Sequence, residues 1–594
     1  MKKSVPAFRI IFLASVILVC LGLLVARLWW LEVVKYDKYA SLVKTGSAVS
    51  VRLPAVRGEI LDRNGIPLVE NRASFEVNFY LPDMVRAYEK EHKAKAPVLD
   101  VKYRHYDLRG NAEDRAEVDI PTVVKDTAIS KLEDLGLAAD YNAERLQVHY
   151  RNNTLVPFNY RQDLDFNTMA KFMENNVGLP GLNAEVKPVR HYPYGALAAQ
   201  LLGYVGPAED INKMQKEELE KGRRYSFYQP DMEGKAQVEL AMDKYLRGEP
   251  GARILRTDAK SQIIEDSEQL DPPKPGDNVY LTIDARLQYV VEDTLRIAGR
   301  AACVVVDVNN GDILAMASVP SFDPNKFVPT VDRASWNELI KDETKPLMNR
   351  TINAYVPGST FKVLTALAVE SKGLNANHYT CTGGVTYGNT FMACWIKSKG
   401  GAHGSLDLEG GLKNSCNAYF FQAGNAAGIE EIDRIGKLLG FGQPTGLPLS
   451  GENPGILDGP EYLKSVNPQD HWRPGLTANV SIGQGSVLVT PVQMAMLAAT
   501  VANGGTCYYP RIIDKVVSRD GNVVLQEPTK VRANLIKDAG MTAEEIEHVR
   551  HGMWRVVNED GGTARKARLR TPGVQAAGKT GTAQNWRRDA KGNR

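Results

Sequence analysis

The sequence Tyr-Val-Pro-Gly-Ser-Thr-Phe-Lys at residues 355–362 constrains the fold more than any other stretch of the chain. Its Pro-Gly pair ends the preceding element, and the residues after it repeat with helical periodicity. Positions three apart share a helix face, so we expect the Ser359 hydroxyl to lie within hydrogen-bond reach of the Lys362 amine. An amine whose pKa is lowered by burial can activate a serine as a nucleophile. Ser-x-x-Lys alone is also common on ordinary helices, so the site needs partners.

A first partner stretch lies at Ser415-Cys416-Asn417, in a predicted loop. A serine and an asparagine two positions apart can direct a hydroxyl and an amide into one cleft. The Ser415 hydroxyl would relay a proton, and the Asn417 amide would hold Lys362 and a substrate carbonyl.

A second partner stretch is Gly-Lys-Thr-Gly-Thr-Ala at residues 578–583, which we predict to be a strand. Alternate side chains of a strand share one face, so Lys579 would be directed at an anionic carboxylate, beside Thr580. The Thr582 N–H and the N–H of the nucleophilic serine would form an oxyanion hole. Gly581 would let a substrate backbone approach closely.

Length and composition place the chain among large globular proteins. A chain of 594 residues is too long for one core and predicts two to four domains. The hydrophobic share of 43% and the charged share of 24% exclude a disordered protein. A net charge of +3 gives no indication of nucleic acid as a partner.

The N-terminal residues predict a membrane anchor. Residues 10–26 are apolar or small, and Lys2, Lys3 and Arg9 precede them. Such a run is about long enough to span a bilayer, and the basic flank puts the N-terminus in the cytoplasm. A cleaved signal peptide is the alternative, but no A-x-A-like site follows the run. The rest of the chain would then lie outside the cytoplasmic membrane, tethered to it by a single span.

We divide the chain at a Pro-rich linker, residues 271–276. Residues 1–31 are predicted as a cytoplasmic tip and transmembrane helix, residues 32–270 as a β-rich pedestal with a head lobe at 84–185, and residues 277–594 as the catalytic domain. Turn sequences predict β-hairpins around residues 62–65 and 309–312. The predicted fold class is therefore α+β and multidomain.

The three motifs, in this order within one domain, resemble those of the serine penicillin-recognising enzymes. Residues 57–65 and 190–195 resemble the pedestal of class B penicillin-binding proteins. Residues 481–493 and 579–584 are more similar to the elongation type than to the division type. This resemblance extends over nearly the whole chain.

The resemblance implies a peptidoglycan D,D-transpeptidase whose helices surround an antiparallel sheet. Ser359 would attack the D-Ala-D-Ala amide of a donor stem peptide, D-Ala would leave protonated through Lys362 and Ser415, and an acceptor amine would take the acyl group. β-Lactams would acylate the same serine, and no cofactor is required for this chemistry. The implied partners are a glycan polymerase of the SEDS type and other elongation-complex membrane proteins. The implied location is the bacterial inner membrane, with the catalytic domain in the periplasm.

One cluster of soft ligands predicts a structural zinc. Cys381, Cys394, His403 and Cys416 form a Cys3His set that suits tetrahedral Zn²⁺. Some elongation-type relatives carry zinc beside the active site, with one ligand inside the Ser-x-Asn motif, where Cys416 stands. A Cys381–Cys394 disulfide and unrelated buried thiols remain as alternatives, and His378 is a weaker choice of fourth ligand.

The resemblance also implies two more strands and a final helix after the Lys-Thr-Gly motif. The sequence stops at Arg594, soon after Thr582, so the transpeptidase domain is expected to be C-terminally incomplete and to fold poorly. The rival functions are a D,D-carboxypeptidase or β-lactamase-type hydrolase, and a catalytically impaired scaffold. A hydrolase needs a base that positions water, and none is recognised.

Overall fold

The computed structural model describes residues 7–30, 47–106, 112–154, 156–175, 179–229, 231–257, 263–331 and 333–583. Helix α1 (Ala7–Trp29) covers the apolar run, and its uncharged part lies between Arg9 and Arg27. Within the described ranges no helix is long and apolar enough to cross a membrane. The transmembrane helix predicted over residues 1–31 is therefore not confirmed.

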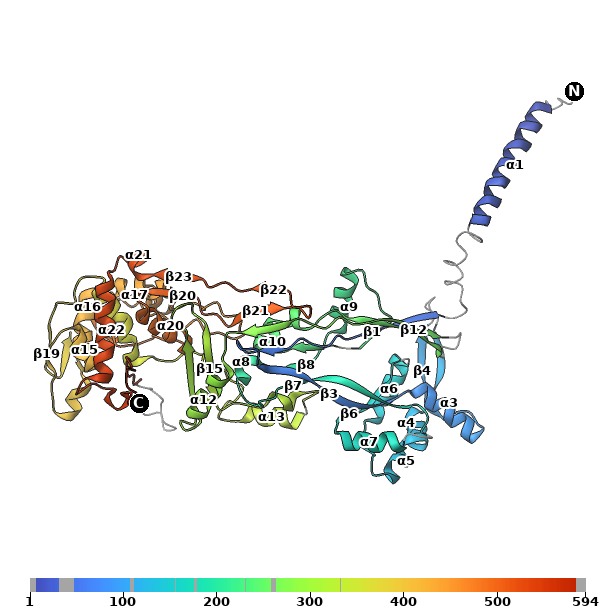
Figure 1. Ribbon diagram of the computed structural model, residues 1–594, viewed down its shortest axis with the longest axis horizontal. Helices are drawn as coiled ribbons and strands as arrows, with labels where there is room; N and C mark the ends of the chain where they lie inside the picture. The colour runs from blue at the N-terminus through green and yellow to red at the C-terminus, as the bar shows by residue number, and fades with distance from the viewer. Residues whose placement is uncertain are drawn as a thin grey trace.

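The described chain from β1 onward is elongated, with a mainly helical region at one end and long strands leading away from it (Figure 1). One sheet runs along the pedestal. In it β1 (Ser47–Leu53) pairs antiparallel with β11 (Gly251–Thr257), which pairs with β12 (Ile263–Asp271). The short strand β9 (Phe227–Tyr228) lies parallel to β1 on its other side.

A seven-stranded sheet joins the pedestal to the helical region, in the order β22-β21-β13-β2-β3-β6, with β7 also paired to β3. The predicted hairpin around residues 62–65 is present, since β2 pairs antiparallel with β3. Strand β13 follows the Pro-rich linker and lies parallel to β2, so the sheet is continuous across that linker. The members are β2 (Ile60–Leu61), β3 (Pro67–Phe79), β6 (Phe158–Leu164), β7 (Leu182–His191), β13 (Asn278–Leu281), β21 (Ile513–Val517) and β22 (Val523–Gln526).

Helices cover the far end of β3, β6 and β7 and form a lobe with its own core. Val77, Phe79, Met84 and Leu146 are buried there, and Phe79 stacks on Tyr160 with ring centroids 4.3 Å apart. The lobe consists of α3 (Leu81–His92), β4 (Val98–Tyr106), β5 (Ala112–Val118), α4 (Ile120–Val124), α5 (Ser130–Asp134), α6 (Ala143–Asn153) and α7 (Phe166–Asn175).

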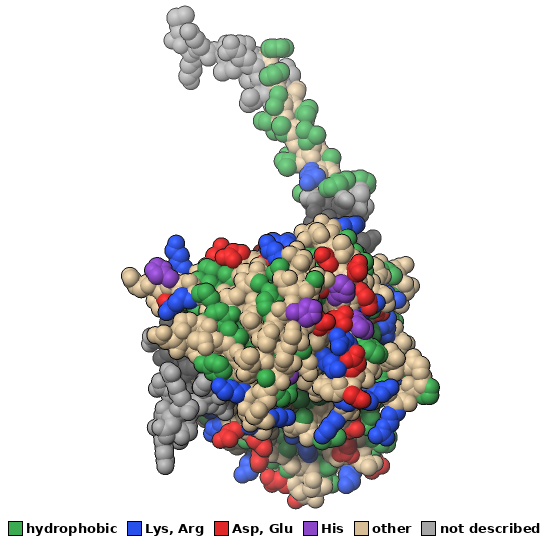
Figure 2. Space-filling model, turned by 90° about the vertical axis from the view of Figure 1, so that its left-hand side faces the viewer, with side chains coloured by type: hydrophobic (Ala, Val, Ile, Leu, Met, Phe, Trp, Pro, Cys, Tyr) green, Lys and Arg blue, Asp and Glu red, His purple; other side chains and the backbone are tan. Residues whose placement is uncertain are grey.

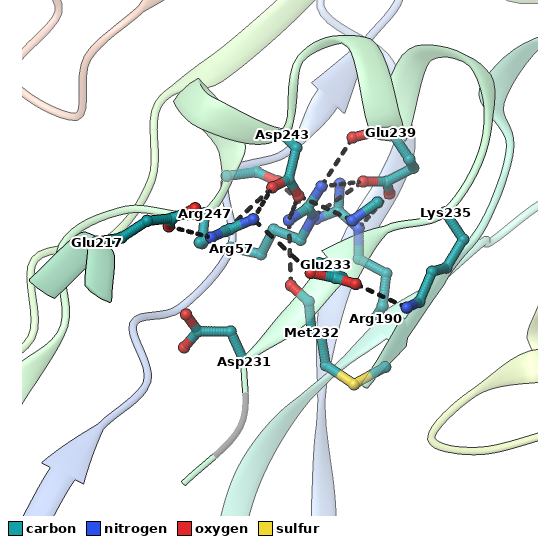
Figure 3. Close-up of polar contacts among 12 residues, drawn as sticks. Arg57, Arg190, Glu217, Asp231, Met232, Glu233, Lys235, Glu239, Asp243 and Arg247 are labelled. Carbon is teal, nitrogen blue, oxygen red and sulfur yellow. Dashed lines mark hydrogen bonds and ion pairs between the residues drawn. The ribbon is translucent and has the colours of Figure 1, made fainter. Parts of the chain in front are cut away.

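A buried ionic network holds the pedestal together where it meets the helical region (Figure 3). Glu239, in helix α10 (Gln237–Ala241), accepts hydrogen bonds from Arg190 Nε at 2.7 Å and from Arg57 Nε at 2.9 Å. Burial alone would raise the pKa of Glu239, but the charges of Arg190 and Arg57 lower it. Arg57 also donates to Asp243, in α11 (Asp243–Leu246), at 2.7 Å. Removing one partner would leave a buried charge unpaired, at a cost of roughly 3–5 kcal/mol.

The helical region follows β13 and carries all three motifs. The second predicted hairpin, around residues 309–312, is present as β14 (Ala301–Val306) paired with β15 (Ile313–Val319). Helix α20 (Pro491–Ala502) begins at a capping box between Thr490 and Gln493. Other major helices are α12 (Ala285–Arg296), α13 (Arg333–Lys341), α14 (Lys362–Glu370), α15 (Leu408–Lys413), α16 (Asn417–Ala427), α17 (Ile429–Leu438), α18 (Pro460–Val466), α19 (Pro474–Ser481) and α22 (Ala543–Asn558).

Helix α14 is the centre of this region. Every one of its residues is buried, including the ionisable residues at its two ends, Lys362 and Glu370. Helices α15, α16, α17 and α22 all contact it. The residue that begins α14, Lys362, is therefore placed inside the domain core and not at its surface.

Candidate active site

Ser359 lies in a 3-10 turn, Gly358–Phe361, that leads directly into α14. The helix predicted after the Pro-Gly pair is thus confirmed, with a tighter first turn. Gly358 adopts a φ of 55°, and its N–H donates to the Gly483 carbonyl at 3.0 Å. A Cβ at position 358 would lie 2.6 Å from the Thr582 carbonyl oxygen. Only glycine fits there, because both the conformation and the close backbone contact exclude a side chain.

Lys362 contacts the Ser-x-Asn segment. Its Nζ donates to the Asn417 Oδ1 at 2.6 Å and to the Ser415 carbonyl at 2.8 Å, and it lies 3.4 Å from the Ser415 Oγ. In the described part of the chain, no hydrogen bond joins Lys362 to Ser359, so the expected direct contact is not present. The Lys362 amine is held instead by acceptors of the Ser415–Asn417 segment.

Ser415 stands between two helices in a left-handed conformation, with a φ of 49°. Helix α15 ends at Lys413, and α16 begins at Asn417 with Cys416 as its N-cap. The Cys416 Sγ accepts the Tyr419 N–H at 3.3 Å. The turn brings Ser415 and Asn417 to the Lys362 amine. The expected Asn417–Lys362 contact is therefore present, although Asn417 is already the first residue of α16 and not part of a loop.

Lys579 reaches the same serine from the far end of the chain. Its Nζ donates to the Ser415 Oγ at 2.7 Å and to the Thr580 carbonyl at 2.9 Å. The strand predicted at 578–583 is wrong, since these residues pair with no strand among those described. Their backbone is held by helix α22 instead, because the Gly578 N–H donates to the Met553 carbonyl at 3.1 Å.

The remaining Lys-Thr-Gly-Thr residues lie against the serine turn. Thr580 shares a 2.9 Å hydrogen bond with Thr563. A Cβ at Gly581 would lie 2.7 Å from the Thr360 Cγ2 and 3.1 Å from the Pro357 carbonyl oxygen, so the serine turn leaves no room for a side chain there. Thr582 lies beside Gly358, since a Cβ at position 358 would be 2.6 Å from the Thr582 carbonyl oxygen. The structure therefore brings together the residues that the sequence predicted for the two sides of an oxyanion hole.

Burial makes both amines less basic. Desolvation, with the nearby positive charge of Lys579 second, lowers the pKa of Lys362 well below its ordinary value. Desolvation lowers the pKa of Lys579 to about 7. A buried amine with a lowered pKa is present partly in its neutral form near neutral pH, and that form accepts a proton. The arrangement can therefore remove a proton from a hydroxyl and return it to a leaving amine.

The predicted metal ligands also come together. One ligand atom from each of Cys381, Cys394, His403 and Cys416 lies within 4.8 Å of the others. The Cys394 and Cys416 Sγ atoms are 3.8 Å apart, and His403 Nδ1 lies 3.6 Å from both the Cys381 Sγ and the Cys394 Sγ. The cysteines of the described residues are free, so the alternative disulfide is not formed. The weaker candidate, His378, is outside the cluster.

Two features of the catalytic domain were not predicted from the sequence. Glu370 ends α14 as a fully buried carboxyl whose oxygens have no hydrogen bond among the described residues, although His548 Nδ1 lies 3.3 Å away. Trp395 donates its Nε1–H to the Asn414 carbonyl at 3.1 Å, next to Ser415. The sequence signal for Glu370 was a charged residue at the end of a run of mostly apolar helix residues. The signal for Trp395 was an aromatic residue next to Cys394.

A cavity of about 630 Å³ lies elsewhere, lined mostly by pedestal residues and also by residues 328–330 of the catalytic domain. Its lining includes Asn78, Arg190, Asp231 and Val328, and no residue of the three motifs borders it. The catalytic chemistry is therefore assigned to the motif residues and not to this cavity.

Comparison of sequences finds two matching families. A family model described as the penicillin binding protein transpeptidase domain matches residues 301–594, and one described as the penicillin-binding protein dimerisation domain matches residues 52–281. Peptidoglycan D,D-transpeptidase MrdA of Acinetobacter baumannii is 30% identical over 602 residues, which cover 98% of this chain and 79% of that protein. The protein of the same name from Escherichia coli K12 is 28% identical, with coverages of 96% and 82%.

Solved structures show the same similarity. Penicillin-binding protein 2 in its complex with MreC from Helicobacter pylori has a TM-score of 0.70 and 25% identity, and the match covers 91% of this chain and 89% of that one. A chain from a peptidoglycan synthase complex that coordinates polymerization and crosslinking has a TM-score of 0.64 and 26% identity, with coverages of 97% and 89%.

Proposed function

The chain belongs to the penicillin-binding proteins, as a peptidoglycan D,D-transpeptidase, and we propose that Ser359 is its nucleophile, with Lys362, Ser415, Asn417 and Lys579 as its catalytic partners. One observation carries this assignment. Residues from all three motifs meet at Ser415, whose Oγ accepts hydrogen bonds from Lys579 at 2.7 Å and from Lys362 at 3.4 Å.

In the acylation step, the neutral Lys362 amine takes the proton of the Ser359 hydroxyl while its oxygen attacks the carbonyl carbon of the D-Ala-D-Ala amide. The N–H groups of Ser359 and Thr582 stabilise the oxyanion of the tetrahedral intermediate. The C–N bond then breaks, and the proton held by Lys362 passes through Ser415 to the leaving D-Ala nitrogen. The products are a serine ester and free D-Ala.

In the second step, the side-chain amine of an acceptor stem peptide attacks the ester carbonyl. Its proton returns to the Ser359 oxygen through the same groups, and the new amide is the cross-link. Lys579 binds the terminal carboxylate of the donor as a cation, with Thr580 and Gly581 beside it. Asn417 keeps Lys362 in place through their 2.6 Å hydrogen bond.

The cysteine cluster fits a structural zinc, which we propose as a bound ion. Tetrahedral Zn²⁺, with bonds of about 2.3 Å to sulfur and about 2.0 Å to nitrogen, requires separations of about 3.8 Å between sulfurs and about 3.6 Å between sulfur and nitrogen. The Cys394–Cys416 separation is 3.8 Å, and His403 Nδ1 lies 3.6 Å from both the Cys381 and the Cys394 sulfur. The ion would fix the loop of Ser415 and would take no part in the acyl transfer.

The biological setting is proposed by analogy with the relatives. We place the protein in cell elongation, on the periplasmic side of the inner membrane, where its substrate lies. The Helicobacter pylori neighbour was solved with MreC, and the second neighbour belongs to a peptidoglycan synthase complex. By analogy, the partners would be elongation-complex proteins, including a glycan polymerase of the SEDS type, and β-lactams would be inhibitors.

Labelling by a fluorescent penicillin tests the nucleophile. The wild-type chain should be labelled covalently, and Ser359→Ala should not be. The matched control is Ser371→Ala, which replaces a serine at the far end of α14 and should keep the label. Failure to label the wild-type chain would favour an impaired scaffold. Incubation with donor and acceptor stem peptides then separates the remaining alternatives, because a transpeptidase gives cross-linked dimer, whereas a D,D-carboxypeptidase gives free tetrapeptide.

A further inference from the structure

A stretch beside the active site contains positive charge but no acidic residue. Residues 371–406 contain Lys372, Lys397 and Lys399 and no Asp or Glu. Lys372 lies 3.8 Å from Glu431, so its charge is balanced. In contrast, charges of both signs alternate over the end of the molecule that includes this stretch (Figure 2). The segment is therefore a local exception to a mixed surface.

Aromatic rings hold the two remaining lysines in place. Lys397 Nζ lies 3.7 Å from the ring centre of Phe391, and Lys399 Nζ lies 5.0 Å from the ring centre of Trp395. Neither lysine forms an ion pair with a carboxylate of the described residues. Cation–π contacts of this kind orient an ammonium group without neutralising its charge. Both amines therefore remain available to an anion.

The rings themselves are exposed. Phe391, in strand β18 (Thr390–Ala393), is 47% exposed, and Trp395 is 37% exposed. Exposed aromatic faces beside cations suit a ligand with both apolar surface and negative charge. We call Phe391, Trp395, Lys397 and Lys399 the aromatic–lysine patch.

The patch is attached to the catalytic loop. The Trp395 Nε1 donates to the Asn414 carbonyl at 3.1 Å, one residue before Ser415. On its other side Trp395 lies against His403, with ring centres 5.3 Å apart. Cys394 precedes the tryptophan, so the cysteine cluster fixes the base of the patch. The patch is therefore joined by one hydrogen bond to the turn that carries Ser415.

We propose that the aromatic–lysine patch binds a peptidoglycan strand through the carboxylates of its stem peptides. This inference rests on the proposed function, and it adds a binding surface outside the three motifs. The lysines would contact the carboxylates, while Trp395 and Phe391 would contact the apolar faces of the sugar rings or peptide. The patch suits a ligand with both negative charge and apolar surface. The peptidoglycan strand that the acyl-enzyme must meet has both.

The test separates binding of the strand from the chemistry of the serine. The variant Lys397→Gln/Lys399→Gln removes both charges, and Lys464→Gln/Lys537→Gln makes the same change at exposed lysines outside the patch. Acylation by a small β-lactam should stay within about twofold of wild type in both variants. Cross-linking of uncross-linked strands should show a KM raised about 3- to 10-fold in the patch variant only, with kcat little changed.

Two further measurements decide the outcome. Strands whose stem-peptide carboxylates are amidated should be bound equally by wild type and patch variant, because the charge contact is missing in both. Strand affinity is also measured directly on Ser359→Ala, with and without the patch substitutions. Affinity should be lower without the patch lysines. Because no turnover is involved, this measurement tests the patch even if Ser359 is not the nucleophile. Equal strand affinity with and without the patch lysines would overturn the proposal, as would preferential binding of anionic phospholipid vesicles or a loss of β-lactam acylation in the patch variant.

Discussion

The Lys579 Nζ donates to the Ser415 Oγ at 2.7 Å, although the two residues are 164 positions apart in the chain. Lys362 approaches the same oxygen, at 3.4 Å. Burial lowers the pKa of both amines, and the charge of Lys579 lowers the pKa of Lys362 further. The site therefore favours one neutral amine and one cation, which is the division of roles that base catalysis and carboxylate binding require.

The pH dependence of acylation should show that one amine must be neutral and the other charged. Lys362 must be neutral to accept the proton, so the rate should rise with pH as this amine loses its proton. Lys579 must be charged to hold a carboxylate, and its pKa of about 7 predicts that the rate falls again above that pH. The second-order rate constant for a carboxylate-bearing β-lactam, measured from pH 5 to 10, should be bell-shaped. In Lys579→Arg the falling limb should move to higher pH, because arginine stays protonated; a flat profile in the wild-type protein would contradict the assignment.

Asn417→Ala should slow acylation about 100-fold. The substitution removes the 2.6 Å hydrogen bond that positions the Lys362 amine, and it leaves the nucleophile itself unchanged. Asn425→Ala is the matched control, since that amide lies on the same helix and donates to the Phe421 carbonyl at 2.8 Å. Stopped-flow measurement with a chromogenic β-lactam compares the two. Equal rates in both variants would mean that Asn417 does not position the base.

The sequence predicted some contacts of the candidate site and missed others. The Pro-Gly pair correctly predicts the helix of Lys362, because the rule depends on local backbone geometry alone. The partner of that lysine depends on the left-handed turn at Ser415 and on the packing of α16 against α14. Such a contact is set by tertiary structure. The motif correctly predicted the contact of Lys362 with Asn417, whereas the local helix rule wrongly predicted one with Ser359.

The same limit explains the incorrect strand. Residues 578–583 have a pattern that a sheet could use, but a strand exists only where a neighbour supplies hydrogen bonds. Here the Gly578 N–H bonds to the Met553 carbonyl of α22 instead. The gathering of the four ligands was easier to predict, because they stand in one stretch and the family resemblance implies a ligand at Cys416; the metal itself stays a prediction. The buried acid Glu370 left no comparable pattern.

Removal of the proposed zinc should lower acylation indirectly. Chelation, or Cys416→Ala, should release the loop that carries Ser415 and so decrease β-lactam acylation, together with a fall in bound metal and in the thermal midpoint of unfolding. Cys303→Ala is the control, because this thiol lies in β14 outside the cluster. Metal content measured by atomic emission should be about one per chain in the wild type. Unchanged metal and unchanged acylation in Cys394→Ala would rule out the site.

Glu370 should make the catalytic domain less stable as pH rises. Burial, followed by the negative charges of Glu545, Glu409 and Glu544, raises the pKa of this carboxyl from 4.5 to about 8. Between these values the folded state retains a proton that the unfolded state releases, so the free energy of unfolding must fall as pH increases. Glu370→Gln removes that titration, and its stability relative to wild type should increase by on the order of 3 kcal/mol between pH 5 and pH 8. Denaturant unfolding at several pH values measures the free energy of unfolding of Glu370→Gln relative to wild type. Glu338→Gln, at an exposed position, is the control and should show no such change with pH. A constant difference for Glu370→Gln across this range would mean that Glu370 is already ionised in the folded protein.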